Sequence, residues 1–184
     1  MSSSWKFFRT FLRSPFQMGG VVPSSRILAR AVAEVVTGHV SDPAGTPLIE
    51  VGPGTGALTR ELIRLPNPLI LLERNPEFAR HLTGQFPGIG VVCEDFLTTT
   101  VFSTGNRGAV LVSSLPVRSL PRPEVFSARF RELLLGGNVG AIIQYSYGWR
   151  DPLQLDDPRI EARRERFVLR NFPPAFVWVY VLRR

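Results

Sequence analysis

Three glycines at alternate positions follow an acidic residue in the stretch Glu50-Val-Gly52-Pro-Gly54-Thr-Gly56, and these residues are well suited to hold a ligand. Glycine adopts backbone conformations that are closed to other residues, and it lets a ligand approach the backbone closely. The residues that follow have a helical pattern, and the N–H groups at a helix start have no partners within the helix. We therefore predict a strand, a tight turn and a helix that together bind a nucleotide-like ligand.

Two classes of ligand bind to such a turn, dinucleotides and S-adenosylmethionine, and the glycines alone do not choose between them. Gly52-Pro-Gly54-Thr-Gly-Ala57 also fits the dinucleotide pattern, and Glu73 stands where a ribose-binding acid is expected in either case. Glu50 favours S-adenosylmethionine, because a carboxylate there can face the ammonium end of an amino-acid-bearing ligand, whereas it would repel a pyrophosphate. The alternative for Glu50 is a structural pair with a core arginine.

The end of the third predicted strand adds an acid and an aromatic residue in Glu94-Asp95-Phe96. Asp95 is placed to accept a hydrogen bond from an adenine amino group, and the ring of Phe96 is placed to lie on the purine. The alternative for Phe96 is an ordinary position in the core. Together with Glu50, this pair favours a methyl donor over a nicotinamide cofactor.

The elements that would position these residues alternate between apolar strands and helices. We predict strands at 47–51, 68–72, 89–93, 109–113 and 138–145, and helices at 56–65, 76–86 and 122–135. Such alternation indicates a parallel sheet covered on both faces. The tail differs, because two predicted strands joined only by a turn must pair antiparallel; they are Arg159–Arg170 and Ala175–Leu182. A helix capped by Ser24 or Ser25 precedes the first strand.

The glycine motif, Glu73 and Glu94-Asp95-Phe96 together resemble the class I S-adenosylmethionine-dependent methyltransferases over roughly residues 20–184. The resemblance implies an α/β, Rossmann-like fold with a seven-stranded, mostly parallel sheet that ends in a C-terminal antiparallel hairpin. It implies that the cofactor is S-adenosyl-L-methionine, with S-adenosyl-L-homocysteine as the product. The cofactor-binding residues that it implies are Glu50, Gly52, Gly54, Gly56, Glu73, Arg74, Asp95, Phe96 and Ser114.

The fourth strand ends in Ser113-Ser-Leu-Pro116-Val117, at the edge of the sheet where an acceptor must meet the methyl group. Ribosomal RNA adenine dimethylases resemble this chain, but they carry Asn-Leu-Pro-Tyr-like motifs at this place. Here the chain has no amide to hold an adenine amino group and no ring to stack on the base, and flipped-base chemistry needs both. This departure counts against nucleic acid as the partner.

A closer resemblance is to the bacterial phospholipid N-methyltransferases, which convert phosphatidylethanolamine stepwise towards phosphatidylcholine. It runs almost end to end, and its most telling stretches are the first helix and Gln144-Tyr145-Ser-Tyr147-Gly148. Tyr145 and Tyr147 are the predicted catalytic residues, because they share one face of a strand and tyrosine rings stabilise a developing quaternary ammonium. Their alternative is a purely structural role in the sheet. The predicted substrate-binding residues are Ser24, Ser25, Leu115 and Arg118.

Residues 5–13 predict an amphipathic helix, because at about 100° per residue the aromatic and cationic side chains fall on opposite faces. A helix of this kind lies in a membrane interface, although a terminal helix that docks its aromatics on the domain is the simpler alternative. We predict a membrane-interface helix over residues 1–15 and a methyltransferase domain over residues 16–184. The predicted membrane contacts are Trp5, Lys6, Phe8, Arg9, Phe11 and Leu12.

Composition sets wider limits on the function. The chain has 184 residues and a net charge of +7, which suits one domain with an anionic partner, either nucleic acid or an acidic membrane. The single Cys93 fits a reducing compartment, and neither histidine has the neighbours of a metal site. We expect a monomer at the cytoplasmic face of the inner membrane, with a phospholipid substrate, no metal and no nucleic-acid partner.

Three other functions stay open at this point. The first is an RNA adenine N6-methyltransferase of the ribosomal RNA dimethylase type. The second is a non-catalytic module that binds S-adenosylmethionine and docks on membranes. The third is a nicotinamide-dependent oxidoreductase, because the glycine pattern also fits a dinucleotide.

Overall fold

The computed structural model describes residues 22–42, 44–103 and 108–183, with side chains from residue 26 onwards. The predicted amphipathic helix at 5–13 and its membrane contacts therefore lie outside the described residues. The predicted split into an N-terminal helix and a methyltransferase domain stays a prediction.

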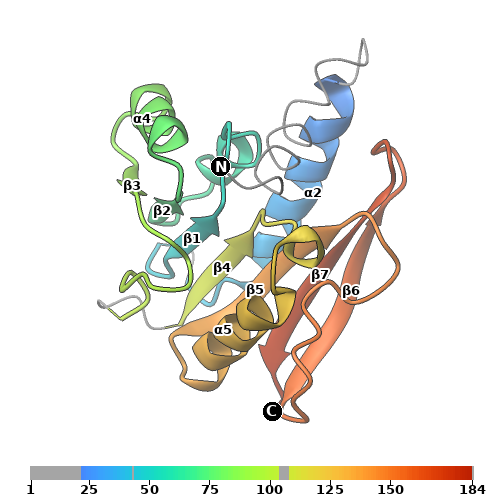
Figure 1. Ribbon diagram of the computed structural model, residues 1–184. Helices are drawn as coiled ribbons and strands as arrows, with labels where there is room; N and C mark the ends of the chain where they lie inside the picture. Colours follow the sequence, from blue (N-terminus) through green and yellow to red (C-terminus); the bar gives the residue numbers. More distant parts are fainter. Residues whose placement is uncertain (1–21, 43, 104–107, 184) are drawn as a thin grey trace.

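Seven strands form one sheet in the order β3-β2-β1-β4-β5-β7-β6 (Figure 1). The first five pair in parallel, whereas β7 lies between β5 and β6 and pairs antiparallel with both. The predicted mostly parallel sheet with a C-terminal antiparallel hairpin is confirmed. The strands are β1 (Leu48–Val51), β2 (Leu69–Leu72), β3 (Gly90–Val92), β4 (Ala109–Ser113), β5 (Val139–Ser146), β6 (Ile160–Val168) and β7 (Ala175–Leu182).

Four α-helices and one short 3-10 helix connect or precede these strands in the described part of the chain. They are α2 (Val22–His39), α3 (Thr59–Leu62), α4 (Pro76–Gln85), η1 (Val117–Ser119) and α5 (Pro123–Leu135). In the described residues, no helix combines the length and apolar character that crossing a bilayer requires.

Two of the helix predictions need correction. The predicted helix at 56–65 is only the four residues of α3, because the glycine turn occupies its expected start and Pro66 soon follows its end. The predicted cap at Ser24 or Ser25 is wrong, because α2 begins at Val22 and already includes both serines.

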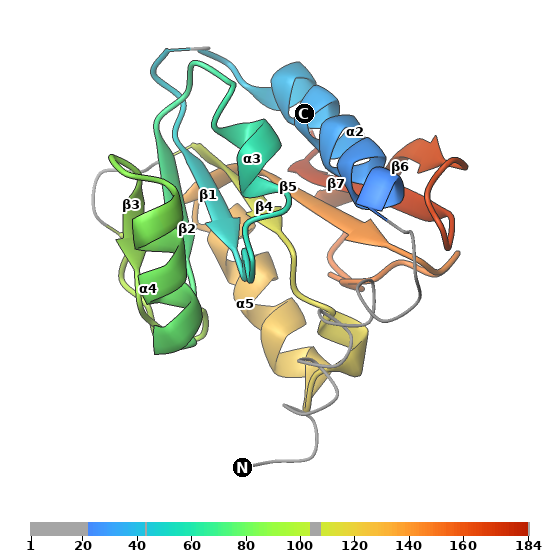
Figure 2. The same cartoon turned by 90° about the horizontal axis from the view of Figure 1, so that it is seen from above.

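The helices form two layers around the sheet, as Figure 2 shows for α2 and α5. On one face α2, α3 and α4 bury an apolar cluster that includes Val32, Leu62 and Leu82. On the other face α5 buries a second cluster around Phe130 and Leu134. Burial of apolar side chains on both faces explains why the central strands are mostly apolar.

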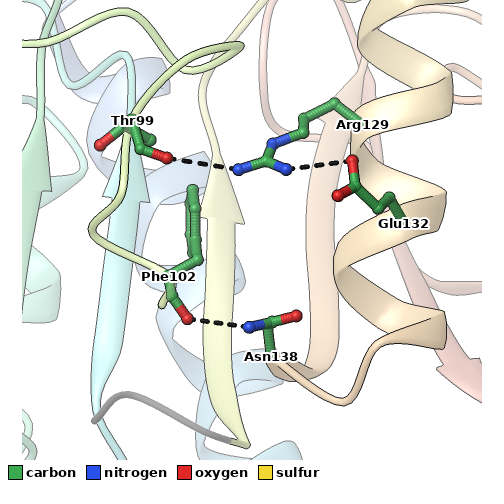
Figure 3. Close-up of polar contacts among 5 residues, drawn as sticks. All are labelled: Thr99, Phe102, Arg129, Glu132 and Asn138. Carbon is green, nitrogen blue, oxygen red and sulfur yellow. Dashed lines mark hydrogen bonds and ion pairs between the residues drawn. The ribbon is translucent and has the colours of Figure 1, made fainter. Parts of the chain in front are cut away.

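The chain after β3 runs over α5 without forming a helix, and side chains of α5 and of the turn after it hold it there (Figure 3). Arg129 donates from Nη2 to the backbone oxygen of Thr99 at 3.3 Å, and from Nη1 to Glu132 at 3.0 Å. Asn138 donates to the backbone oxygen of Phe102 at 3.0 Å. These bonds satisfy loop carbonyls that no strand or helix would otherwise pair.

We expect Arg129→Met to lower the free energy of unfolding by about 1–2 kcal/mol, because it leaves the oxygen of Thr99 without its donor. Arg64→Met is the matched control, since Arg64 also pairs with a carboxylate three residues away but is well exposed. That exposed pair contributes only ~0–1 kcal/mol. Urea unfolding measures both variants, and equal losses would contradict a specific role for the Arg129 contact with the loop.

Candidate functional site

The predicted glycine turn between β1 and α3 has a backbone that favours glycine at each of its three positions. The φ angles of Gly52, Gly54 and Gly56 are 71°, 58° and 76°, all in the left-handed region. A Cβ on Gly52 would lie 2.6 Å from Cδ2 of Leu115, and one on Gly56 would lie 2.5 Å from the ring of Phe86. The turn is therefore packed closely at both ends and leaves no room for side chains there.

Glu73, at the end of β2, holds the middle of this turn. Its Oε2 accepts a hydrogen bond from the backbone N–H of Gly54 at 3.2 Å, and its Oε1 accepts one from Asn75 at 2.8 Å. Burial raises the pKa of Glu73, and these backbone bonds oppose the rise. The carboxylate thus links the glycine turn to the start of α4. Its predicted contact with ribose stays a prediction.

Glu50 is fully buried beneath the turn and has one oxygen without a partner. Its Oε2 accepts a hydrogen bond from Thr59 at 2.6 Å, whereas Oε1 has no hydrogen-bond partner among the described residues. Burial raises the pKa of Glu50 to about 7, against the effect of hydrogen bonds from Thr59 and Ser114. No arginine of the described chain pairs with Glu50, so the alternative of a core ion pair is not supported.

Leaving a buried carboxylate oxygen unpaired is costly, and native proteins rarely do so without a ligand or a functional reason. An ammonium group bound at the glycine turn would satisfy this oxygen. The residues present therefore fit the amino-acid end of S-adenosylmethionine.

Asp95 and Arg74 lie side by side because they follow neighbouring parallel strands. The Oδ2 atom of Asp95 is 3.3 Å from Nη1 of Arg74, and its Oδ1 accepts a hydrogen bond from the N–H of Leu97 at 2.9 Å. The pair is partly exposed at the carboxyl edge of the sheet, so an adenine amino group could reach the carboxylate. This role of Asp95 stays a prediction.

Phe96 belongs to the core beneath α5. Its ring centroid is 4.5 Å from that of Phe130, it also contacts Phe102 and Phe126, and the residue is only 4% exposed. The structural alternative describes this position better than a ring free to lie on a purine. A contact between Phe96 and the cofactor stays a prediction.

Tyr145 and Tyr147 lie together at the carboxyl end of β5, as their spacing predicts. Their ring centroids are 6.0 Å apart with an edge-to-face angle of 76°. Burial raises the pKa of both hydroxyls, while hydrogen bonds with Ser114 for Tyr145 and with Asn171 for Tyr147 oppose the rise. Both hydroxyls therefore stay protonated at neutral pH and can donate to an acceptor.

Ser114 joins the two halves of the site. It follows β4, and its backbone N–H donates to the oxygen of Val51 at 2.9 Å, which fixes it beside the glycine turn. Its side chain lies close enough to Glu50 and to Tyr145 to lower the pKa of each group. The predicted cofactor side and the predicted acceptor side therefore meet at Ser114.

The predicted substrate-binding residues are less closely gathered. Leu115 packs over Gly52 at the site. Arg118 is exposed and donates to the backbone oxygen of Asp151 at 3.2 Å. Ser24 and Ser25 lie in the first turns of α2, and their side chains fall outside the described part. Substrate binding by these four residues stays a prediction.

Two buried polar residues of the site were not predicted from the sequence. Thr59 supplies the hydrogen bond to Glu50, and Gln144 donates from Nε2 to the backbone oxygens of Leu115 and Tyr145 at 3.1 and 2.8 Å. A hydroxyl soon after the glycine turn is a signal for Thr59, since a buried acid needs a donor. For Gln144, an amide inside an apolar strand is the corresponding signal.

No family model matches this chain, but parts of it are similar to curated proteins. It is 30% identical over 105 residues to ribosomal RNA small subunit methyltransferase A of Nitrosomonas europaea, covering 56% of this chain and 40% of that protein. It is 31% identical over 80 residues to the same-named protein of Chlorobium limicola, covering 43% of this chain and 30% of that protein. The matched stretches thus span less than half the length of these relatives.

The fold is similar to solved methyltransferase structures. Magnesium protoporphyrin IX methyltransferase (ChlM) from Synechocystis PCC 6803, with bound SAM, has a TM-score of 0.69 at 14% identity, covering 100% of this chain and 98% of that chain. The 23S rRNA methyltransferase ErmE has a TM-score of 0.60 at 19% identity, covering 85% of this chain and 67% of that chain. Together with the strand order, these likenesses show the class I methyltransferase fold.

We expect Gly56→Ala to lower the free energy of unfolding by more than ~1 kcal/mol, because the new methyl group meets Phe86 and forces a left-handed residue. Gly84→Ala is the matched control, since Gly84 lies within α4 with nothing within 4 Å of its added Cβ. Alanine there should gain up to ~1 kcal/mol of helix propensity. Thermal unfolding of both variants tests the contrast, and a stabilised Gly56 variant would refute it.

The pKa of Glu50 predicts how stability without cofactor depends on pH. Because the folded pKa is about 7 and the ordinary value is 4.5, the folded protein keeps a proton that the unfolded chain loses. The contribution of Glu50 to the free energy of unfolding is fully present below pH 4.5. It falls by about 3 kcal/mol as the pH rises from 4.5 through 7. Glu50→Gln should remove this part of the decline. Urea unfolding across pH 4.5–8 measures it, and parallel curves for both proteins would contradict the prediction.

Proposed function

We propose that this chain is an S-adenosylmethionine-dependent N-methyltransferase. Its proposed acceptor is the head-group amine of phosphatidylethanolamine and of its mono- and dimethylated forms, towards phosphatidylcholine, at an anionic membrane surface. The observation that carries the proposal is the arrangement at the strand ends, where Ser114 lies near both the buried carboxyl group of Glu50 and Tyr145, whose ring is 6.0 Å from that of Tyr147. This arrangement brings Glu50, the proposed cofactor-binding group, close to Tyr145, the proposed amine-orienting group.

The residues at the glycine turn fit the parts of the cofactor in order. The unpartnered oxygen of Glu50 suits the ammonium group, and the turn lets the backbone approach the methionine chain closely. Glu73 and Asp95, after neighbouring strands, suit the ribose hydroxyls and the adenine amino group. When bound, the cofactor supplies a methyl group made electrophilic by its sulfonium.

The chain's own task is then to orient a neutral amine and to exclude water from it. The amine nitrogen forms a bond to the methyl carbon as the carbon–sulfur bond breaks, and the bonding pair stays on sulfur. The nitrogen becomes cationic, and the faces of Tyr145 and Tyr147 stabilise that charge through cation–π attraction. A product that still carries an N–H proton releases it to solvent before the next transfer. Alignment and desolvation supply most of the catalysis.

The end of β4 favours a lipid amine over a flipped base. Ser113 is buried, and its hydroxyl accepts a hydrogen bond from the N–H of Leu115 at 3.3 Å, so this residue itself offers neither an amide nor a ring. The nearby amide of Gln144 is only 2% exposed; its Nε2 donates to two backbone oxygens, while its Oε1 has no hydrogen-bond partner among the described residues. A flipped adenine needs an amide and a ring, and the last residues of β4 supply neither themselves.

RNA adenine N6-methylation is the second candidate, and the curated relatives favour it over the lipid. Both relatives described above are named as ribosomal RNA methyltransferases. The net charge of +7 suits RNA as well as an anionic membrane. A non-catalytic module that binds the cofactor is a further possibility that the same assay separates from both.

The test is incubation of the full chain with labelled S-adenosylmethionine and either mixed vesicles or ribosomal RNA. The vesicles contain phosphatidylethanolamine and phosphatidylglycerol. We expect label in the lipid extract as mono-, di- and trimethylated head groups. Label in RNA alone would establish the second candidate instead, and label in neither would indicate a binding module.

Asp95→Ala should raise the KM for S-adenosylmethionine about tenfold, because it removes one hydrogen bond to a charged group, worth ~1.5 kcal/mol. Tyr147→Phe keeps the ring and removes the hydroxyl, so it should lower kcat and leave that KM unchanged. Initial rates at varied cofactor concentration separate the two effects. Unchanged kinetics in both variants would show that neither Asp95 nor Tyr147 contributes to the site.

A further inference from the structure

Four large apolar side chains are exposed near the edge of the sheet that carries the site. Trp149 is 72% exposed, Phe167 48%, Leu169 69% and Phe172 79%, and we call these four residues the apolar rim. Large exposed apolar groups that gather in one place mark interaction surfaces more often than scattered ones do.

The strand register places the apolar rim beside Tyr145 and Tyr147. Ser146, at the end of β5, pairs with Phe176 near the start of β7, so the β6–β7 turn lies at the carboxyl end of β5. Figure 1 shows this turn at the same edge of the sheet as the carboxyl end of β4. The apolar rim therefore borders the acceptor side of the site.

Packing holds two of the three exposed rings of the apolar rim. The ring of Trp149 is 4.8 Å from that of Phe176, and the ring of Phe167 stacks on Phe176 at 4.7 Å. Phe176 itself is buried in the sheet, so it anchors both. Rings held in this way lose little conformational freedom when they bind a surface.

Arginines flank the apolar rim. The guanidinium of Arg164 lies 5.7 Å from the ring centre of Trp149, and Arg150 and Arg170 are exposed nearby in the sequence. None of these three arginines forms an ion pair with another described residue. Glu165 is the single acid of the stretch 164–176. The surface thus combines aromatic side chains with unpaired cations.

We infer that the apolar rim docks on an anionic lipid bilayer, with its arginines against lipid phosphates. Tryptophan and phenylalanine at an interface, with arginine beside them, match the polarity gradient of a membrane surface. A second copy of this chain fits less well, because it would bring arginines against arginines. RNA is the alternative that the first test separates, because three of the four rim residues offer rings on which bases could stack.

Docking on a bilayer would serve catalysis only if the proposed function, methylation of a lipid amine, is correct. A membrane seated on the apolar rim would hold lipid head groups at the same edge as Tyr145 and Tyr147. The amine could then reach the site while the acyl chains stay in the bilayer. Binding itself does not require that the lipid be the acceptor.

The first test is co-sedimentation of the full chain with vesicles of phosphatidylglycerol and phosphatidylethanolamine. Phe172→Ser and Trp149→Ser each change one well-exposed side chain, so we expect both variants to fold. Each should bind the vesicles at least fivefold more weakly, and neutral phosphatidylcholine vesicles should bind the unaltered chain weakly. Leu182→Ser and Ile63→Ser are matched controls, because both residues are about 40% exposed and lie outside the rim.

The N-terminal residues are the same in all these proteins, so their contribution to binding cancels. Equal vesicle binding by rim and control variants would overturn the inference. So would a loss of RNA binding in the rim variants with vesicle binding unchanged, since the rim would then be an RNA surface.

The second test separates docking from catalysis. Rim variants should keep their turnover of a short-chain phosphatidylethanolamine dissolved as monomers, and should lose at least fivefold on vesicles. Weaker vesicle binding by the rim variants, without methylation of any lipid by the unaltered chain, would support the rim and refute the lipid acceptor. Equal losses on monomers and vesicles would refute docking and place the rim in the catalytic site.

Discussion

The turn between β1 and α3 depends on one buried constraint, the left-handed backbone at Gly52, Gly54 and Gly56. That backbone turns the N–H of Gly54 toward Glu73, which accepts its hydrogen bond. It also brings Gly52 against Leu115 and Gly56 against Phe86, with no space for a Cβ on either glycine. Strands β1, β2 and β4 meet at this turn. A site built on three neighbouring strand ends is rigid, because each strand is held by the sheet on both sides.

Much of the fold could be predicted from the sequence, because its signals are local. Apolar runs of strand length and helical periodicity predict each strand to within two residues and most of α4 and α5. The exceptions have local causes as well: the glycine turn and Pro66 shorten α3, and α2 extends back beyond its two serines. The loop after β3 has no periodic signal, since its position depends on Arg129 and Asn138, which lie far away in the sequence.

The candidate site was predictable in part for the same reason. The glycines and the acids at strand ends form a pattern that can be recognised in the chain, whereas the sequence signals of Thr59 and Gln144 do not say which groups they bond to. Phe96 shows the limit most clearly, because an aromatic residue after an acid suits a purine and a core equally well. Which of the two it meets is decided by α5, which the local sequence does not encode.

The position of β7 between β5 and β6 has a consequence for the order in which the molecule can assemble. Within the sheet, β6 pairs with β7 alone, although β6 is synthesised first. A growing chain thus carries β6, with Arg164 and Phe167, as an unpaired strand until residues 175–182 leave the ribosome. The glycine turn and its strands can close earlier. The glycine turn could therefore form during translation, whereas the apolar rim beside it forms only after β7 has been synthesised.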